Sequence, residues 1–158
     1  MGFFFLLQSS PASFPMTFKI FFYIIFMTFS TANQAISASE KTLPACRDTP
    51  NCVSSQALDA KHFIAGFKIN GNPAEAWKTL KEILNKQSRL VITHETTNSI
   101  HAEATSLVFR FVDDLDFIYN PRTNLIDVRS ASRTGHSDFG VNRKRIETLR
   151  LQMQKAHV

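Results

Sequence analysis

Acidic residues are absent from the first 39 positions of this 158-residue chain, and Lys19 is the only basic residue before Lys41. The same stretch holds nine of the 15 Phe residues, so its composition differs sharply from that of the remaining residues. The chain also lacks an uncharged apolar run of the roughly 20 residues that a helix needs to cross a bilayer. Its length excludes a large multidomain enzyme, and 44% apolar residues exclude a fully disordered chain.

The apolar run at residues 20–29 has the length expected for the core of a secretory signal peptide, and Lys19 stands just before it. We predict that residues 1–32 are this signal peptide and that cleavage follows Ala32. Met16 is an alternative true start, because the chain from that residue has the ordinary layout of a signal peptide. An uncleaved membrane anchor is the other interpretation of the segment.

The chain after Ala32 carries 17 basic and 13 acidic residues. This mild excess does not indicate a nucleic-acid partner. Residues 33–42 are small and polar and predict a flexible leader, and residues 43–158 predict a single domain. We expect export to the periplasm or the cell envelope, with an anionic ligand or another envelope protein as partner. Peripheral contact with a membrane is left open.

The chain has only two cysteines, Cys46 and Cys52, and no Cys-x-x-Cys motif of the kind found in redox and zinc sites. Export would place both cysteines in an oxidising compartment. We therefore predict a structural disulfide that closes a small loop. A metal site and two free thiols are the alternatives.

Turn residues and apolar periodicity divide the domain into helices and strands. Asn72 is a good N-cap and Pro73 suits the first position of a helix, which should run to about Lys86. A second helix is expected over residues 141–155. Strands are expected over residues 63–69, 90–96, 99–106, 109–119 and 125–132. Their short connections predict an α+β fold, an antiparallel four- to five-stranded sheet with two helices packed on one face.

The strand expected at residues 109–119 has one apolar face, because its large apolar residues share one parity: Phe109, Phe111, Leu115, Phe117 and Tyr119. Asp113 has the same parity, and a carboxylate on an apolar face needs a partner. A β-bulge at Asp113 and Asp114 that turns both side chains outward is one explanation. Acid–base chemistry is the other.

His101 and Glu103 are two positions apart in an expected strand and therefore share a face. With Asp113 they are the candidate catalytic residues of a hydrolase-like enzyme. Both cysteines lie upstream with the wrong spacing for a zinc deaminase, and no His-x-x-x-His pair occurs, so we predict no metal and no cofactor. The simpler interpretation is a hydrogen-bonded pair on a strand.

A polar loop with two glycines leads into the last helix, and such a loop can direct backbone N–H groups at an anion. The alternative is that Asp138 itself is the anion, caps the helix and pairs with Arg133 or Arg143. The candidate ligand-binding residues are Arg110, Arg129, Arg133, Asp138, Asn142 and Arg143. The last helix is basic, but no aromatic residue lies in 143–158 to anchor it at a lipid surface.

Three segments, residues 46–55, 101–114 and 128–145, together resemble the domain-of-unknown-function family 1499 (DUF1499). With the spacing between them they cover nearly all of the chain after the predicted signal peptide. Thr49 stands where the family usually has Ser, and Ala104 where a larger residue is usual. The resemblance implies a bacterial exported or membrane-associated protein, with relatives in chloroplasts and no settled activity.

The sequence therefore leads us to expect a non-catalytic module that binds an anionic small molecule, a lipid headgroup or a protein partner. The alternative is a hydrolase-like enzyme that uses His101, Glu103 and Asp113. Ser54 and Ser55 lack the context of a nucleophile elbow, so a serine nucleophile is not expected.

Overall fold

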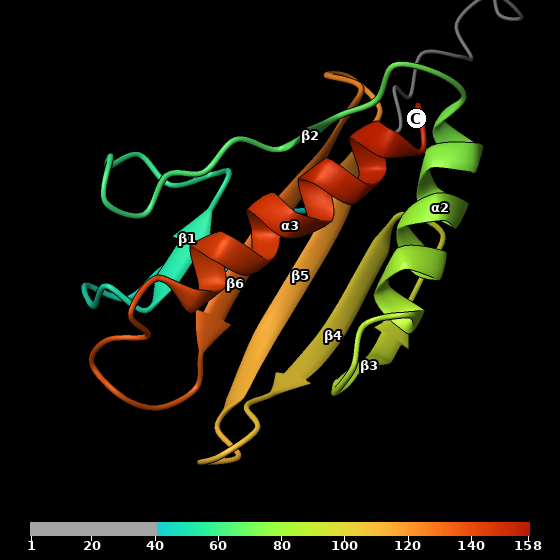
Figure 1. Ribbon diagram of the computed structural model, residues 1–158. Coiled ribbons are helices and arrows are strands. Elements are labelled where there is room, and N and C mark those ends of the chain that lie inside the picture. The colour runs from blue at the N-terminus through green and yellow to red at the C-terminus, as the bar shows by residue number, and fades with distance from the viewer. Residues whose placement is uncertain (1–40) are drawn as a thin grey trace, which may run out of the picture. The chain divides into compact units, whose positions relative to one another are not determined.

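An antiparallel sheet carries both helices on one face in the computed structural model, which describes residues 41–158 (Figure 1). The predicted signal peptide (1–32), the alternative start at Met16 and the leader as far as residue 40 lie outside the described residues. Within the described part, no helix is long and apolar enough to cross a membrane.

The strand order of the sheet is β1-β6-β5-β4-β3, and β2 also pairs with β6. All of these pairings are antiparallel. The elements are β1 (Cys52–Ser54), β2 (Phe67–Lys68), α2 (Pro73–Asn85), β3 (Leu90–Glu95), β4 (Ser99–Thr105), β5 (Val112–Asn120), β6 (Leu125–Ser132) and α3 (Val141–Lys155). The predicted α+β class and the two helices on one face are confirmed. The sheet has six strands rather than four to five, because the short strand β1 joins its edge.

The first helix begins where its capping residue predicts. The Asn72 side chain accepts a hydrogen bond from the Ala74 backbone N–H at 2.8 Å, and Pro73 occupies the first turn. Trp77, Leu80 and Leu84 of α2 are buried. Ile146, Leu149 and Met153 of α3 are likewise buried. Each helix therefore buries one apolar face.

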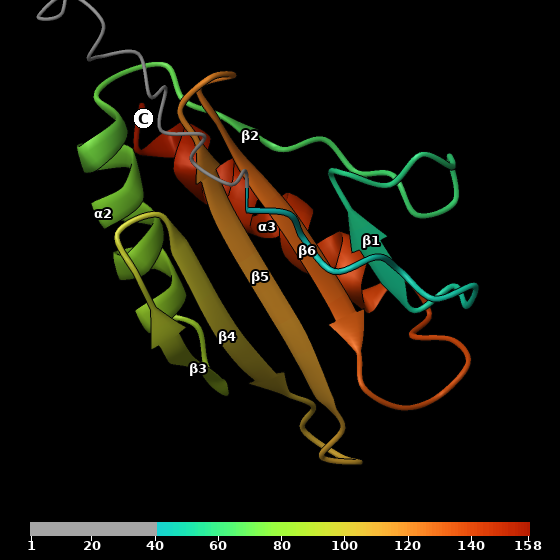
Figure 2. The ribbon, with the colours of Figure 1, turned by 180° about the vertical axis from the view of Figure 1, so that it is seen from behind.

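The core lies between these helices and the alternate residues of the central strands. Ile100, Phe117 and Val128 are paired across β4, β5 and β6, and all three are almost wholly buried. Side chains at the intervening positions point to the opposite face, which neither α2 nor α3 covers and which we call the uncovered face (Figure 2). Figure 2 shows that face, with the segment that leads into β1 running across it.

The disulfide between Cys46 and Cys52 is present, as predicted. It joins the segment that crosses the uncovered face to the start of β1. Cys52 is paired with Ala131 of β6, so the disulfide holds this segment at the edge of the sheet.

The strand predicted over residues 109–119 begins instead at Val112. Residues 106–111 form the connection between β4 and β5, and Phe109 and Phe111 are exposed there. Arg110 has a left-handed backbone (φ 53°), which ends the alternation on which the prediction depended. The alternative of a β-bulge is also wrong, because β5 keeps an unbroken register through Asp113 and Asp114.

Candidate functional site on the uncovered face of the sheet

The charged side chains of β4, β5 and β6 gather on the face of the sheet opposite the helices. The register places His101 beside Asp116, and Asp116 beside Arg129. One step along the strands, Glu103 lies beside Asp114. Because alternate residues of a strand share a face, these side chains form one continuous cluster.

Ion pairs connect the members of this cluster into a row. Arg129 Nη1 lies 3.0 Å from one oxygen of Asp116, and the other oxygen lies 2.7 Å from His101 Nδ1. His101 Nε2 lies 3.5 Å from Asp114 Oδ1, and Arg133 Nη2 is 2.8 Å from the same oxygen. We call this set, which also includes Glu103, the charged row: Arg129, Asp116, His101, Asp114, Arg133 and Glu103.

Arg133 closes one end of the charged row. Its guanidinium donates to both oxygens of Asp114 and, at 2.5 Å, to Glu103. The hydrogen bonds to Asp114 and, next, to Glu103 raise the pKa of Arg133 above its usual value. Both carboxylates therefore share one permanent cation, whose single positive charge balances one of their two negative charges.

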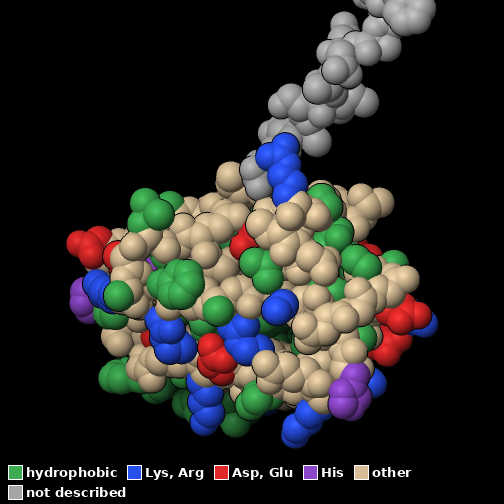
Figure 3. Space-filling model, turned by 90° about the horizontal axis from the view of Figure 1, so that it is seen from above, with side chains coloured by type: hydrophobic (Ala, Val, Ile, Leu, Met, Phe, Trp, Pro, Cys, Tyr) green, Lys and Arg blue, Asp and Glu red, His purple; other side chains and the backbone are tan. Residues whose placement is uncertain are grey.

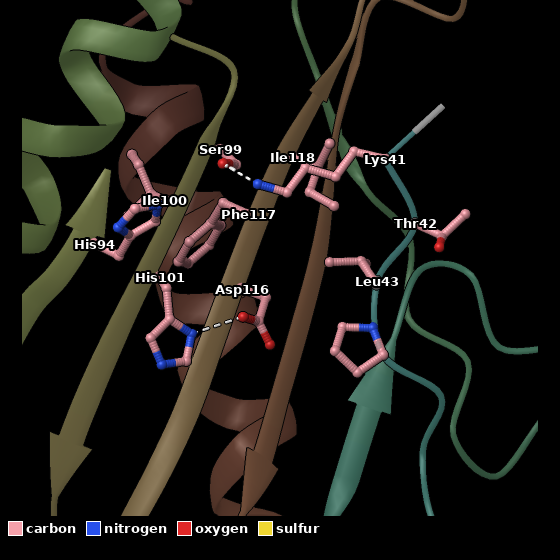
Figure 4. A pocket seen from close by; sticks show the side chains of 11 residues that line it. Lys41, Thr42, Leu43, His94, Ser99, Ile100, His101, Asp116, Phe117 and Ile118 are labelled. Carbon is pink, nitrogen blue, oxygen red and sulfur yellow. Dashed lines mark hydrogen bonds and ion pairs between the residues drawn. The ribbon is translucent and has the colours of Figure 1, made fainter. Parts of the chain in front are cut away.

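A cavity of about 200 Å³ lies at the other end of the charged row. Its walls come from the segment Lys41–Pro44 on one side and from β3, β4 and β5 on the other. The side chains of His94, His101 and Asp116 surround it in Figure 4. Lys41 reaches across the cavity and donates to Ser99 Oγ at 2.5 Å.

One group within the charged row has the composition of a metal site. His101, Glu103 and Asp114 each offer a ligand atom, and these atoms lie within 4.8 Å of one another. A cation there would have to compete with Arg133 for both carboxylates. The geometry therefore permits a metal only if this arginine moves away.

The structure does not bring together the predicted catalytic set of His101, Glu103 and Asp113. Asp113 lies on the opposite face of the sheet, beneath α3, where Ser132 Oγ and Arg145 Nη2 donate to it at 2.6 and 2.7 Å. The backbone of β5 thus separates Asp113 from the other two residues. Its place beside them is taken by Asp114.

The predicted anion pocket at the start of α3 contains its own acid. Asp138 accepts hydrogen bonds from the backbone N–H groups of Gly140 and Asn142 at 3.0 and 2.8 Å. Arg133 turns toward Asp114 instead, and Arg143 donates to the carbonyl groups of Phe63 and Lys61. Asp138 therefore caps the helix without the arginine partners that the sequence suggested.

The remaining candidate ligand-binding residues are dispersed. Arg110 is exposed in the β4–β5 connection, and Asn142 is buried beneath α3. Arg129 belongs to the charged row, where Asp116 neutralises it. The candidates at positions 110, 129 and 142 consequently do not converge on one pocket.

Sequence reasoning missed Lys41, Asp114 and Asp116 as members of the site. The two aspartates carried a usable signal, because they share the parity of the polar face of β5. Lys41 carried no such signal. It lies in a segment without secondary structure, and its partner Ser99 is 58 positions away in the sequence.

The fold and this face define a small α+β domain whose short edge strand is held by a disulfide and whose uncovered sheet face bears a row of ion pairs. Residues 42–153 match the family described as "Protein of unknown function (DUF1499)", and the chain belongs to this family. A comparison with curated proteins finds no match. The family description assigns no activity, so function has to be argued from the site.

Proposed function

We propose that the protein is an exported, non-catalytic binding module of the cell envelope that takes a small anionic molecule on its uncovered sheet face. The observation that carries the proposal is the cavity beside Lys41, His94 and His101. A cavity of about 200 Å³ has room for a phosphate or a short carboxylic acid. The disulfide supports export, since disulfides persist mainly in oxidising compartments.

The charges around the cavity favour an anion over a cation. Asp116 is already paired with Arg129, so its charge is compensated within the protein. Among residues 41–158, Lys41 donates only to the neutral hydroxyl of Ser99, and its side chain is exposed. An anion that enters the cavity therefore meets an ammonium group without a carboxylate partner among the described residues, which favours a charge-assisted hydrogen bond.

The same ion pairs argue against acid–base catalysis by the carboxylates of the charged row. Each carboxylate of the charged row is held by an arginine, Glu103 and Asp114 by Arg133 and Asp116 by Arg129. A carboxylate that serves as a general base must be able to take up a proton near the working pH. These paired acids stabilise the face of the sheet and orient His101 instead.

Calorimetric titration of the protein with inorganic phosphate, and separately with succinate, tests the proposal. We expect at least one of these anions to bind and Lys41→Gln to weaken binding about tenfold, the loss of one charge-assisted hydrogen bond. The matched control is Lys78→Gln, which removes an exposed lysine from α2. Equal binding by both variants, or no binding of either anion to the wild type, would contradict the proposal.

A metal-dependent hydrolase is the second candidate, because His101, Glu103 and Asp114 lie within ligand distance of one another. In that case Zn²⁺ would bind in one equivalent and His101→Ala would abolish binding. Arg133→Ala should then strengthen zinc binding, since it frees two carboxylates. Zinc binding with this response to both variants would favour the enzyme over the binding module.

A further inference from the structure

The connection between β4 and β5 presents an unusual run of exposed apolar side chains. Leu107, Val108 and Phe109 are each exposed by more than 70%, and Phe111 by 53%. We call residues 107–111 the hairpin tip. It extends beyond the ends of the neighbouring strands, at the lower end of the sheet in Figure 1.

The hairpin tip is held in a defined shape rather than folded back onto the domain. The Ser106 backbone N–H donates to the Phe111 carbonyl at 2.8 Å, and the Phe111 N–H donates to Ser106 Oγ at 2.9 Å. The rings of Phe109 and Phe111 stack with their centroids 5.6 Å apart. These contacts keep the apolar side chains together on the outside of the molecule.

A third exposed aromatic residue, Phe139, lies at the same end of the sheet. Ser132, the last residue of β6, is paired with Asp113 near the start of β5, so the loop that follows β6 leaves the sheet beside the hairpin tip. Phe139 in that loop is 96% exposed, and Val141 at the start of α3 is also exposed. Both loops lie toward the lower end of the sheet in Figure 1.

Basic side chains surround these apolar residues. Arg110 lies within the hairpin tip, and Arg89 lies beside its base, where the Arg89 carbonyl accepts from the Thr105 N–H. Lys144 is exposed in the first turn of α3. Within residues 41–158, none of these three cations has an acidic partner.

The acids near this end are already engaged. Arg133 holds Glu103 and Asp114, and Arg145 holds Asp113. Asp138 is bound to backbone N–H groups at the start of α3. Five cations, including Arg89, Arg110 and Lys144, thus face four acids, and the net charge around the hairpin tip is positive. Figure 3 views the opposite end of the domain, where acidic, basic and apolar side chains are interspersed.

We propose that the hairpin tip and the loop bearing Phe139 dock on the surface of an anionic lipid bilayer. A convex tip with a cation between two aromatic residues does not form the flat or concave patch of a stable protein interface, but it can enter a fluid interface without a matching shape. Phe and Leu side chains can bury themselves at the boundary between headgroups and acyl chains, and basic residues are attracted to anionic lipids. This surface is independent of the cavity beside Lys41.

The experiment has to report on the hairpin tip itself, because residues 20–29 could hold the full chain on any bilayer. Trp77 is the only tryptophan and is buried, so Phe109→Trp adds one exposed reporter. With vesicles of phosphatidylglycerol, we expect its emission to shift to the blue and to be quenched by brominated acyl chains. Thr123→Trp, in the turn between β5 and β6 at the other end of the sheet, is the matched control and should not respond.

Charge is tested in the Phe109→Trp background. Adding Arg110→Glu should reduce the blue shift and the quenching of the tryptophan reporter on phosphatidylglycerol vesicles severalfold, whereas adding Lys68→Glu, an exposed position on β2, should have little effect on either signal. Vesicles of phosphatidylcholine should produce a much smaller shift. An unshifted emission with phosphatidylglycerol, or an equal shift at Thr123→Trp, would overturn the proposal and leave a protein partner as the explanation of the exposed tip.

Discussion

Arg145 of α3 donates through Nη2 to Asp113 of β5 at 2.7 Å, across 32 positions of the sequence. The Asp113 side chain is 9% exposed and the arginine side chain 20%, so the pair is largely removed from water. Ser132 donates to the other carboxylate oxygen. The pair therefore fixes the first turns of α3 against the start of β5.

Replacing only one partner of this pair should be costly. We expect Arg145→Met to lower the free energy of unfolding by about 3 kcal/mol, because it leaves the Asp113 carboxylate buried without a counter-charge. The double variant Asp113→Asn/Arg145→Met should recover part of that loss. Urea denaturation of the two single variants and the double variant measures the coupling. Additive losses would show that the ion pair contributes no interaction energy.

Asn142 should be as sensitive to replacement as the ion pair. It is wholly buried; its side-chain oxygen accepts from Ser130 Oγ and Arg145, and its amide donates to the Asn51 carbonyl and Ser132 Oγ. Asn142→Ala would leave several of these groups unsatisfied, and we expect a loss of about 3 kcal/mol in urea denaturation. Asn85→Ala, at the exposed end of α2, is the control and should change stability by less than about 0.5 kcal/mol.

Sequence patterns located the buried position of Asp113 but not its partner. The parity of β5 placed this aspartate on the apolar face, and the register confirms that face. Arg145 could not be identified, because its direction depends on how α3 is rotated over the sheet. Local periodicity determines which face of a helix is apolar, while the opposing contacts come from the tertiary arrangement.

The boundaries of the sheet were harder to predict than its central strands. The α2 prediction ended within one residue of the structure, because Asn72 and Pro73 mark its start chemically. Strand β1 was missed, because three residues give too short a pattern and it pairs with a strand far along the chain. Phe109 and Phe111 of the hairpin tip were wrongly assigned to the strand that became β5, because the parity of apolar residues does not show where strand pairing stops.

Stability should fall at acid pH in part through Asp59. The hydrogen bond from the His62 side chain, followed by the one from its backbone N–H, lowers the pKa of this carboxyl below its ordinary value. A lowered pKa in the folded state means that the contribution is complete above about pH 4 and is lost as the pH falls through the folded pKa. Melting temperatures of the wild type and Asp59→Asn should therefore differ at about pH 6 and converge near pH 2. A difference in melting temperature that stays constant over this range would exclude Asp59 as a source of the loss of stability at acid pH.

The disulfide should contribute modestly to stability while holding the edge of the sheet. Cys46 and Cys52 are six positions apart, and closing so short a loop is expected to stabilise the fold by about 2 kcal/mol. We expect the Cys46→Ser/Cys52→Ser variant to remain folded, because β1 also pairs with Ala131, Ser130 and Arg129 of β6. Urea denaturation gives the loss, and hydrogen exchange should show faster exchange in β1 with little change in β4 and β5.

The oxidised state itself is checked by alkylating the purified protein before and after reduction and measuring its intact mass. Both thiols should react only after reduction, and alkylation of the unreduced protein would contradict the disulfide.

A loss well above about 2 kcal/mol in the double serine variant would instead mean that the segment crossing the uncovered face detaches with β1. The buried side chain of Leu43 would then become exposed, and the wall of the cavity formed by Lys41–Pro44 would be lost. Anion binding at Lys41 would fall together with stability, which links the disulfide to the proposed site.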